Sequence, residues 1–244
     1  MSGLLGYFRS LRHRVPLSIL VTIGAVALGY VMVMRDDMTA MGDVAFVRLF
    51  EGVNHGLYAG IMYNPAFLIL AYPILVFVGS VPQIVRRGGV SSGIAVATAV
   101  AFSVSLLHSA LLLACEGVFF WISGVPTLEG GLSVLFFAAE YAGFTLFFMS
   151  CALLMLVVYV LGSTRASTAV LVAFAYGLSD YFLAMSPLRG MWFANIGWTN
   201  VSAILLSPPD ALAAVGRLFG WCGIGLLLLY LASQERDYYR TSVE

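Results

Sequence analysis

The sequence predicts an all-α integral membrane protein with six transmembrane helices, preceded by an amphipathic helix at the membrane interface. Of the 244 residues, 61% are hydrophobic and only 10% are charged, whereas soluble domains carry about 25% charged residues. The apolar residues also fall in runs of roughly 20, the length that crosses a hydrocarbon core about 30 Å thick as a helix. Water therefore cannot be the main solvent of this chain.

The apolar runs place the six spans approximately at residues 16–34, 65–81, 92–122, 132–161, 167–185 and 211–232. No repeat of fixed period and no low-complexity tract separates them. A single transmembrane domain covering residues 1–244 is therefore expected.

Residues 1–15 are predicted to form the interfacial helix. Apolar side chains recur there at helical spacing, at Leu4, Phe8, Leu11 and Val15. Arginines and a histidine occupy the other faces, a pattern typical of helices that lie in the membrane interface.

The distribution of arginine predicts that both termini are cytoplasmic. All twelve basic residues are arginine, and eight of them fall in segments that an inside N-terminus places in the cytoplasm: Arg9, Arg12, Arg14, Arg86, Arg87, Arg165, Arg236 and Arg240. The other four are Arg35, Arg48, Arg189 and Arg217. Because cytoplasmic loops carry the excess of basic residues, this bias favours that orientation.

Two of the predicted outer segments are long, at residues 35–64 and 186–210. The second contains Trp192 and Trp198, and tryptophans at such positions usually lie at the level of the headgroups. Its apolar stretch, residues 201–206, is too short to cross the bilayer. We therefore expect 186–210 to be a re-entrant or interfacial segment, shielded by protein.

Three acids lie inside apolar spans, Glu116, Glu140 and Asp180, and His108 lies in the middle of the third span. Intramembrane acids normally face a bundle interior or a watery cavity. One interpretation is that the acids line an outward vestibule for a cationic or amphipathic substrate, with His108 in a proton relay. The alternative is that each acid is paired or protonated, and that His108 is an ordinary interior side chain.

Several function classes lack their characteristic residues. The chain has no lysine and no GxxxxGK[ST] pattern, so it cannot itself be a P-loop motor. Cys115, Cys151 and Cys222 lack metal-ligand spacing, and we expect no disulfide, metal or nucleic-acid partner. No HExxH or GxSxG pattern occurs, so this chain is expected not to be an enzyme.

The cytoplasmic connection at residues 82–91 carries the sequence Ile-Val-Arg-Arg-Gly-Gly-Val-Ser from Ile84 to Ser91. Together with the amphipathic start, the long first outer loop and the charged ending Gln-Glu-Arg-Asp at 234–237, it resembles the small permease subunits of bacterial type-two ABC exporters. The resemblance extends over the whole chain through short motifs. Two positions depart from the family pattern: Arg87, followed by glycine, stands where a tyrosine is usual, and Gly93-Ile94 replaces an aromatic-lysine pair.

That resemblance implies the type-two ABC exporter permease architecture in a bacterial cytoplasmic membrane. Residues 1–15 would be the elbow helix and 82–91 the coupling loop, with Gln83, Arg86, Arg87 and Gly88 contacting a separate P-loop ATPase. ATP and Mg²⁺ would bind on that partner, and this chain would hold no cofactor. A second permease subunit, identical or similar, would complete the pathway, and members often act in immunity to antimicrobial peptides.

Two other readings remain open. The chain could be a secondary transporter or channel that uses Glu116, Glu140, Asp180 and His108 directly with an ion gradient. It could also be an intramembrane hydrolase, although no paired-acid or His-x-x-x-His spacing supports that chemistry. Dependence on a soluble ATPase distinguishes the permease from both.

Overall fold

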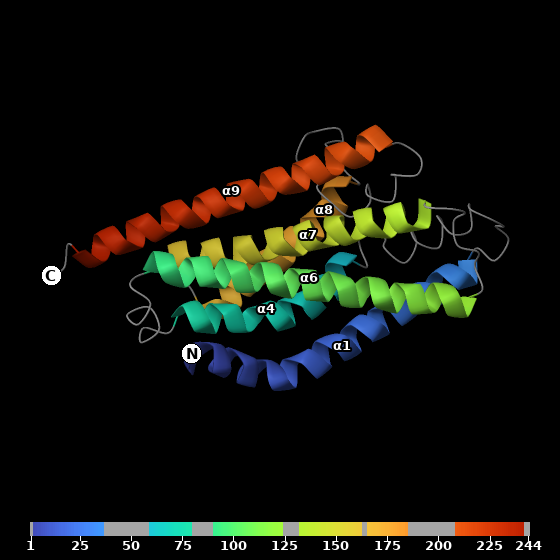
Figure 1. Cartoon of the computed structure of the whole chain (residues 1–244), viewed down its shortest axis with the longest axis horizontal. Coiled ribbons are helices and arrows are strands. Elements are labelled where there is room, and N and C mark those ends of the chain that lie inside the picture. The colour runs from blue at the N-terminus through green and yellow to red at the C-terminus, as the bar shows by residue number, and fades with distance from the viewer. Residues whose placement is uncertain are drawn as a thin grey trace.

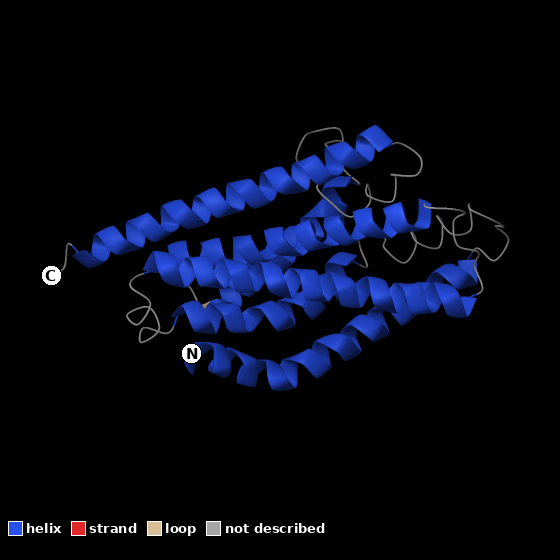
Figure 2. Cartoon of the chain, viewed as in Figure 1, coloured by secondary structure: helices blue, strands red, loops and turns tan. Residues whose placement is uncertain are grey.

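The computed structural model describes residues 2–36, 59–79, 90–123, 132–162, 165–184 and 208–241. These residues form six α-helices and one π-helix, and no strand occurs among them (Figures 1 and 2). The elements are α1 (Ser2–Asp36), η1 (Ala59–Tyr63), α4 (Asn64–Gly79), α6 (Val90–Ser123), α7 (Leu132–Gly162), α8 (Ala166–Ala184) and α9 (Pro208–Thr241).

Five of the six predicted spans start within three residues of an α-helix of the structure, and the first, 16–34, lies inside the longer α1. Four of these helices, α1, α6, α7 and α9, are long and apolar enough to cross a membrane. The apolar parts of η1 with α4 and of α8 are shorter, at residues 60–76 and 166–179. The protein is therefore an all-α, multi-pass membrane protein with four helices of spanning length among the described residues.

The helices run alternately up and down the long axis of the bundle (Figure 1). The start of α1, the end of α4, the start of α6 and the end of α9 lie at one end of the bundle. The end of α1, the end of α6 and the starts of α7 and α9 lie at the other. Both described termini therefore lie at the same end of the bundle.

Helix α7 is the centre of the bundle. It contacts α6, α8, α9 and α4, and 72% of its apolar window Phe137–Leu161 is buried, against 22% for Val215–Gln234 of α9. Large apolar side chains remain exposed on the outer helices, including Leu107, Trp121 and Phe219. Lipid tails are as apolar as these side chains, so their exposure costs nothing in a bilayer.

The predicted elbow segment, residues 1–15, is helical but is not a separate helix. It forms the first turns of α1, which continues through Pro16 to Asp36 and bends in its first half (Figure 1). A proline inside a helix removes one backbone hydrogen bond and permits such a bend. Two residues after Pro16, the Ser18 hydroxyl donates a hydrogen bond to the Ala66 carbonyl at 2.8 Å and connects α1 to α4.

Helices α4 and α8 touch through an asparagine and a glycine. The Asn64 side-chain amide donates to the carbonyls of Ala173 and Phe174 at 3.3 and 3.5 Å. The missing side chain of Gly177 leaves the room that Asn64 occupies, because a Cβ there would overlap the amide. This contact fixes the start of α4 against α8.

Replacing Gly177 with alanine should therefore destabilise the protein by about 1 kcal/mol, since interhelical hydrogen bonds in membranes contribute about that much or less. Unfolding in mild detergent, followed by circular dichroism against denaturant, measures the change. The matched control is Gly223→Ala on α9, where a Cβ would meet nothing within 4 Å. Equal destabilisation by both substitutions would contradict the assigned contact.

Candidate functional site

Two of the predicted intramembrane acids come together inside the bundle. Glu116 on α6 and Glu140 on α7 are 1% and 0% exposed, and their carboxyl groups interact electrostatically. The packing of the two antiparallel helices explains the meeting. His108 of α6 and Phe148 of α7 lie in contact, with ring centroids 4.7 Å apart. Glu116 lies eight residues after His108, and Glu140 lies eight residues before Phe148, so the two acids lie on the same side of this contact along the two antiparallel helices.

The same face of α6 carries the other buried polar side chains of that helix. Ser105, His108, Ser109, Leu112 and Glu116 are all buried, and steps of three and four residues place them on one side of a helix. Charged and hydroxyl groups thus lie inside the bundle while Leu107 and Val118 face outward. This arrangement is the reverse of a soluble helix and is expected where lipid is the solvent.

Tyr63 and Asn64 complete the buried polar region, and sequence reasoning missed both. They lie at the junction of η1 and α4, and both side chains are fully buried. Tyr63 interacts electrostatically with Glu116 and Cys115 of α6. The sequence signal was a Tyr-Asn-Pro step at 63–65, which falls where the outer loop was expected to end. π-Helical turns of this kind occur often at functional sites.

His108 lies about two helical turns from Glu116 and is packed between aromatic rings. Its ring lies 5.7 Å from Phe67 and 4.7 Å from Phe148, centroid to centroid. Neither ring nitrogen has hydrogen-bond geometry to another described residue, although the backbone of Tyr63 lies close enough to interact with the imidazole. The structure therefore gives His108 a packing environment and no direct contact with the carboxyl pair.

The remaining predicted site residues are placed only in part. Asp180 lies in the last turns of α8, but its side chain is outside the described part of the structure. The coupling residues Gln83, Arg86, Arg87 and Gly88 fall between α4 and α6, also outside the described residues, and so does the predicted re-entrant segment 186–210 except for its last three residues, which begin α9.

A buried carboxyl group is stable as the protonated acid or beside a counter-cation. Neither carboxyl oxygen of Glu140 has a hydrogen-bond partner among the described residues. Among the described residues, no group of three or more His, Cys, Asp or Glu side chains could hold a metal ion.

A His108→Phe variant should fold with a stability within about 1 kcal/mol of the wild type, because an apolar ring fills the same aromatic contacts with Phe67 and Phe148. Detergent-solubilised protein and a denaturant titration measure this. The His108→Ala variant, which removes the ring, should lose more stability. A larger loss for His108→Phe than for His108→Ala would show that a ring nitrogen has an essential partner.

The fold and this polar interior define an all-helical, multi-pass membrane protein with ionisable groups buried between its helices. No family model, no curated protein and no solved structure matches the chain.

Proposed function

We propose that the chain is the transmembrane permease subunit of an ATP-driven export complex. The observation that carries the proposal is the gathering of basic segments at one end of the bundle. The start of α1, the end of α4, the start of α6 and the end of α9 lie there (Figure 1). The connection between α4 and α6, residues 80–89, carries Arg86 and Arg87 and begins and ends at this end.

A basic connection between two membrane helices suits docking to a soluble ATPase. The chain has no P-loop, so ATP-driven transport would need a partner that binds the nucleotide. The ATPase would bind residues 82–91 on the cytoplasmic side, bind ATP and Mg²⁺, and move the attached ends of α4 and α6. A rigid-body shift of packed helices would then open the pathway. A second permease subunit, identical or similar, would supply its other wall.

The test is purification of the tagged chain from its native membranes in mild detergent, followed by mass spectrometry and an ATPase assay. The expected result is a P-loop ATPase in stoichiometric amount, with ATP hydrolysis that disappears when the partner's P-loop lysine is replaced. A homogeneous oligomer of this chain that transports substrate without any ATPase would refute the proposal.

The substrate class follows only from the family resemblance, and we propose peptides or other amphipathic molecules. Deleting the gene should then sensitise cells to a cationic antimicrobial peptide, and the wild-type gene should restore resistance. Unchanged sensitivity across a panel of such peptides would exclude this class of substrate.

One observation favours a second candidate function, a secondary transporter. The buried pair Glu116 and Glu140 is the kind of group that carries protons in ion-coupled transporters. Transport by the purified chain in proteoliposomes, driven by a pH gradient without ATP, would establish this candidate in place of the permease.

A further inference from the structure

Arg14 is held at the junction of α1 and α4 by an aromatic ring. Its Cζ atom lies 4.6 Å from the centroid of the Tyr72 ring, and both side chains are half-buried. One turn further along α1, the hydrogen bond from Ser18 to Ala66 fixes the spacing of the two helices. A guanidinium over a tyrosine ring is attracted by the electrons of the ring face. The contact therefore orders Arg14 and leaves the N–H groups of its guanidinium for another partner.

The chain places no acid near Arg14 on the α1 and α4 side of the bundle. The first acid in the sequence is Asp36, the last residue of α1, at the opposite end of that helix. The segments η1 and α4 contain no acid. The first acid of α6 is Glu116, near the far end of that helix. The connections at the end of the bundle where α1 begins, residues 80–89 and 163–165, contain none either.

The described acids at this end of the bundle belong to α9. They are Glu235 and Asp237, and Arg236 and Arg240 lie beside them on the same helix. Helix α9 packs on α7 and α6 and runs along the edge of the bundle opposite α1 (Figure 1). An arginine at the edge of an apolar region is stabilised by an anion beside it. For Arg14, that anion has to come from outside the described helices.

Arg14 and Tyr72 lie where the apolar parts of their helices end. The apolar window of α1 is Arg14–Val31, and that of η1 with α4 is Gly60–Val76. Because α1 and α4 run in opposite directions, the start of the first window and the end of the second lie at the same end of the bundle (Figure 1). In a bilayer this is the level of the lipid headgroups, where tyrosine and arginine side chains commonly lie.

The surface of α1 beyond Arg14 suits the acyl chains of a lipid. Leu17, Val21 and Leu28 follow at helical spacing on the same side of the helix as Arg14, and they are exposed or half-exposed. An amphipathic anion can place its head beside Arg14 and its chains over these apolar side chains. A soluble anion gains nothing from them, so the combination favours a lipid.

We propose that Arg14 binds the phosphate of an anionic phospholipid at the junction of α1 and α4, and that Tyr72 positions the guanidinium for this contact. The planar fork of N–H groups on arginine matches the oxygens of a phosphate. A zwitterionic headgroup brings its own cation next to its phosphate and should bind more weakly. This inference goes beyond the proposed permease function and does not depend on an ATPase.

Arg12 provides a matched control for Arg14. It is exposed and lies two residues earlier on α1, and residues two apart on a helix do not share a face. Replacing either arginine with glutamine makes the same change in net charge at the same end of the bundle. Only the change at Arg14 removes the guanidinium that lies over Tyr72.

Native mass spectrometry of the full-length chain, purified in mild detergent without partners, tests the site. Phosphatidylglycerol and phosphatidylcholine with identical acyl chains are added in equal amounts. The wild type should bind its first phosphatidylglycerol at least about fivefold more tightly than phosphatidylcholine, the effect of one arginine near a charged lipid surface. The Arg14→Gln variant should lose this preference, and the Arg12→Gln variant should keep it.

Two substitutions of Tyr72 test its positioning role. The Tyr72→Phe variant keeps the aromatic face and should bind phosphatidylglycerol as the wild type does. The Tyr72→Leu variant removes that face, and its affinity should fall about two- to fivefold, the effect of a cation–π contact at an exposed site. Equal binding by both variants would refute the positioning role of the ring.

A photoreactive phosphatidylglycerol locates the site in the wild type, so that no variant has to fold. With a diazirine in the acyl chain near the glycerol, crosslinks should map to α1 between Arg14 and Val21 or to the end of α4. Excess inorganic phosphate should leave the crosslinking unchanged, because the acyl chains contribute to binding.

Four outcomes would overturn the proposal. The wild type could bind the two lipids equally well. Arg14→Gln and Arg12→Gln could lose the same affinity, which would show a general attraction of anionic lipid to the basic end of the bundle. Crosslinks confined to α9 would place the lipid elsewhere. Displacement by inorganic phosphate would make the ligand a soluble anion.

Discussion

Replacing Arg86 and Arg87 together with glutamate is expected to remove the ATPase from the purified complex. The recovery of the partner per permease should fall at least tenfold, because reversing charges that pair with a partner costs about 2–5 kcal/mol and each 1.4 kcal/mol is tenfold in affinity. Quantitative mass spectrometry of the tagged permease measures the ratio. Membrane insertion and elution as a monodisperse species should be unchanged, since the two residues lie outside the apolar spans.

The matched control is the double reversal of Arg236 and Arg240, near the end of α9. It makes the same change in net charge at the same end of the bundle, and we expect the ATPase to remain bound. Equal loss in both variants would show a general electrostatic effect instead of a docking site. Full recovery of the partner in the variant at 86 and 87 would place the docking site elsewhere.

Replacing Phe148 with alanine should destabilise the protein by on the order of 2 kcal/mol. Phe148 is fully buried on α7, stacks on Phe67 of α4 at 4.8 Å and forms a T-shaped pair with His108 of α6 at 4.7 Å, centroid to centroid. Truncation leaves a cavity among three helices. In soluble cores a Phe-to-Ala change costs about 3–5 kcal/mol, and the transfer part of that cost is smaller where lipid is the solvent.

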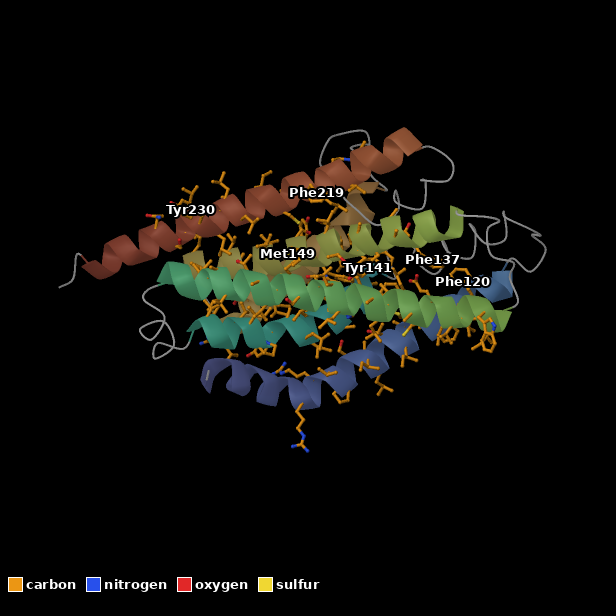
Figure 3. The ribbon with its side chains drawn as sticks, in the orientation of Figure 1. Phe120, Phe137, Tyr141, Met149, Phe219 and Tyr230 are labelled. Carbon is orange, nitrogen blue, oxygen red and sulfur yellow. The ribbon has the colours of Figure 1, made fainter. Side chains whose placement is uncertain are left out.

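Denaturant unfolding in detergent measures the loss, and Phe219→Ala is the control. Phe219 lies on the outer side of α9 and is 60% exposed (Figure 3), so its truncation leaves no internal cavity and should change stability by less than about 0.5 kcal/mol. If both variants lose the same stability, the aromatic contact at the junction of α4, α6 and α7 does not hold the bundle together.

The helices could be predicted from the sequence because the bilayer sets their length. A run of apolar residues near 20 is visible without any knowledge of partners, and the span predicted at 132–161 became α7 at Leu132–Gly162. The prediction for the N-terminus was less accurate. Pro16 was taken as the start of a new helix, whereas the chain accommodates it inside α1 with a bend.

The individual acids of the candidate site could be predicted from the sequence, but their arrangement in space could not. Glu116 and Glu140 stand out in the sequence because an acid in an apolar run is expensive. Their meeting depends on the register between α6 and α7, which is fixed by contacts such as that of His108 with Phe148 and leaves no signal in either run alone. Tyr63 was missed because the π-helical turn that carries it into the interior cannot be read from composition.

The central position of α7 has a consequence for biosynthesis. Of the six α-helices described, α7 is the fourth to leave the ribosome, so α1, α4 and α6 emerge before the helix around which they pack. Glu116 therefore leaves the ribosome before Glu140 does. A lone acid costs a few kcal/mol at insertion. The long apolar stretch Gly93–Ile122 of α6 therefore has to keep Glu116 in the membrane until α7 is inserted.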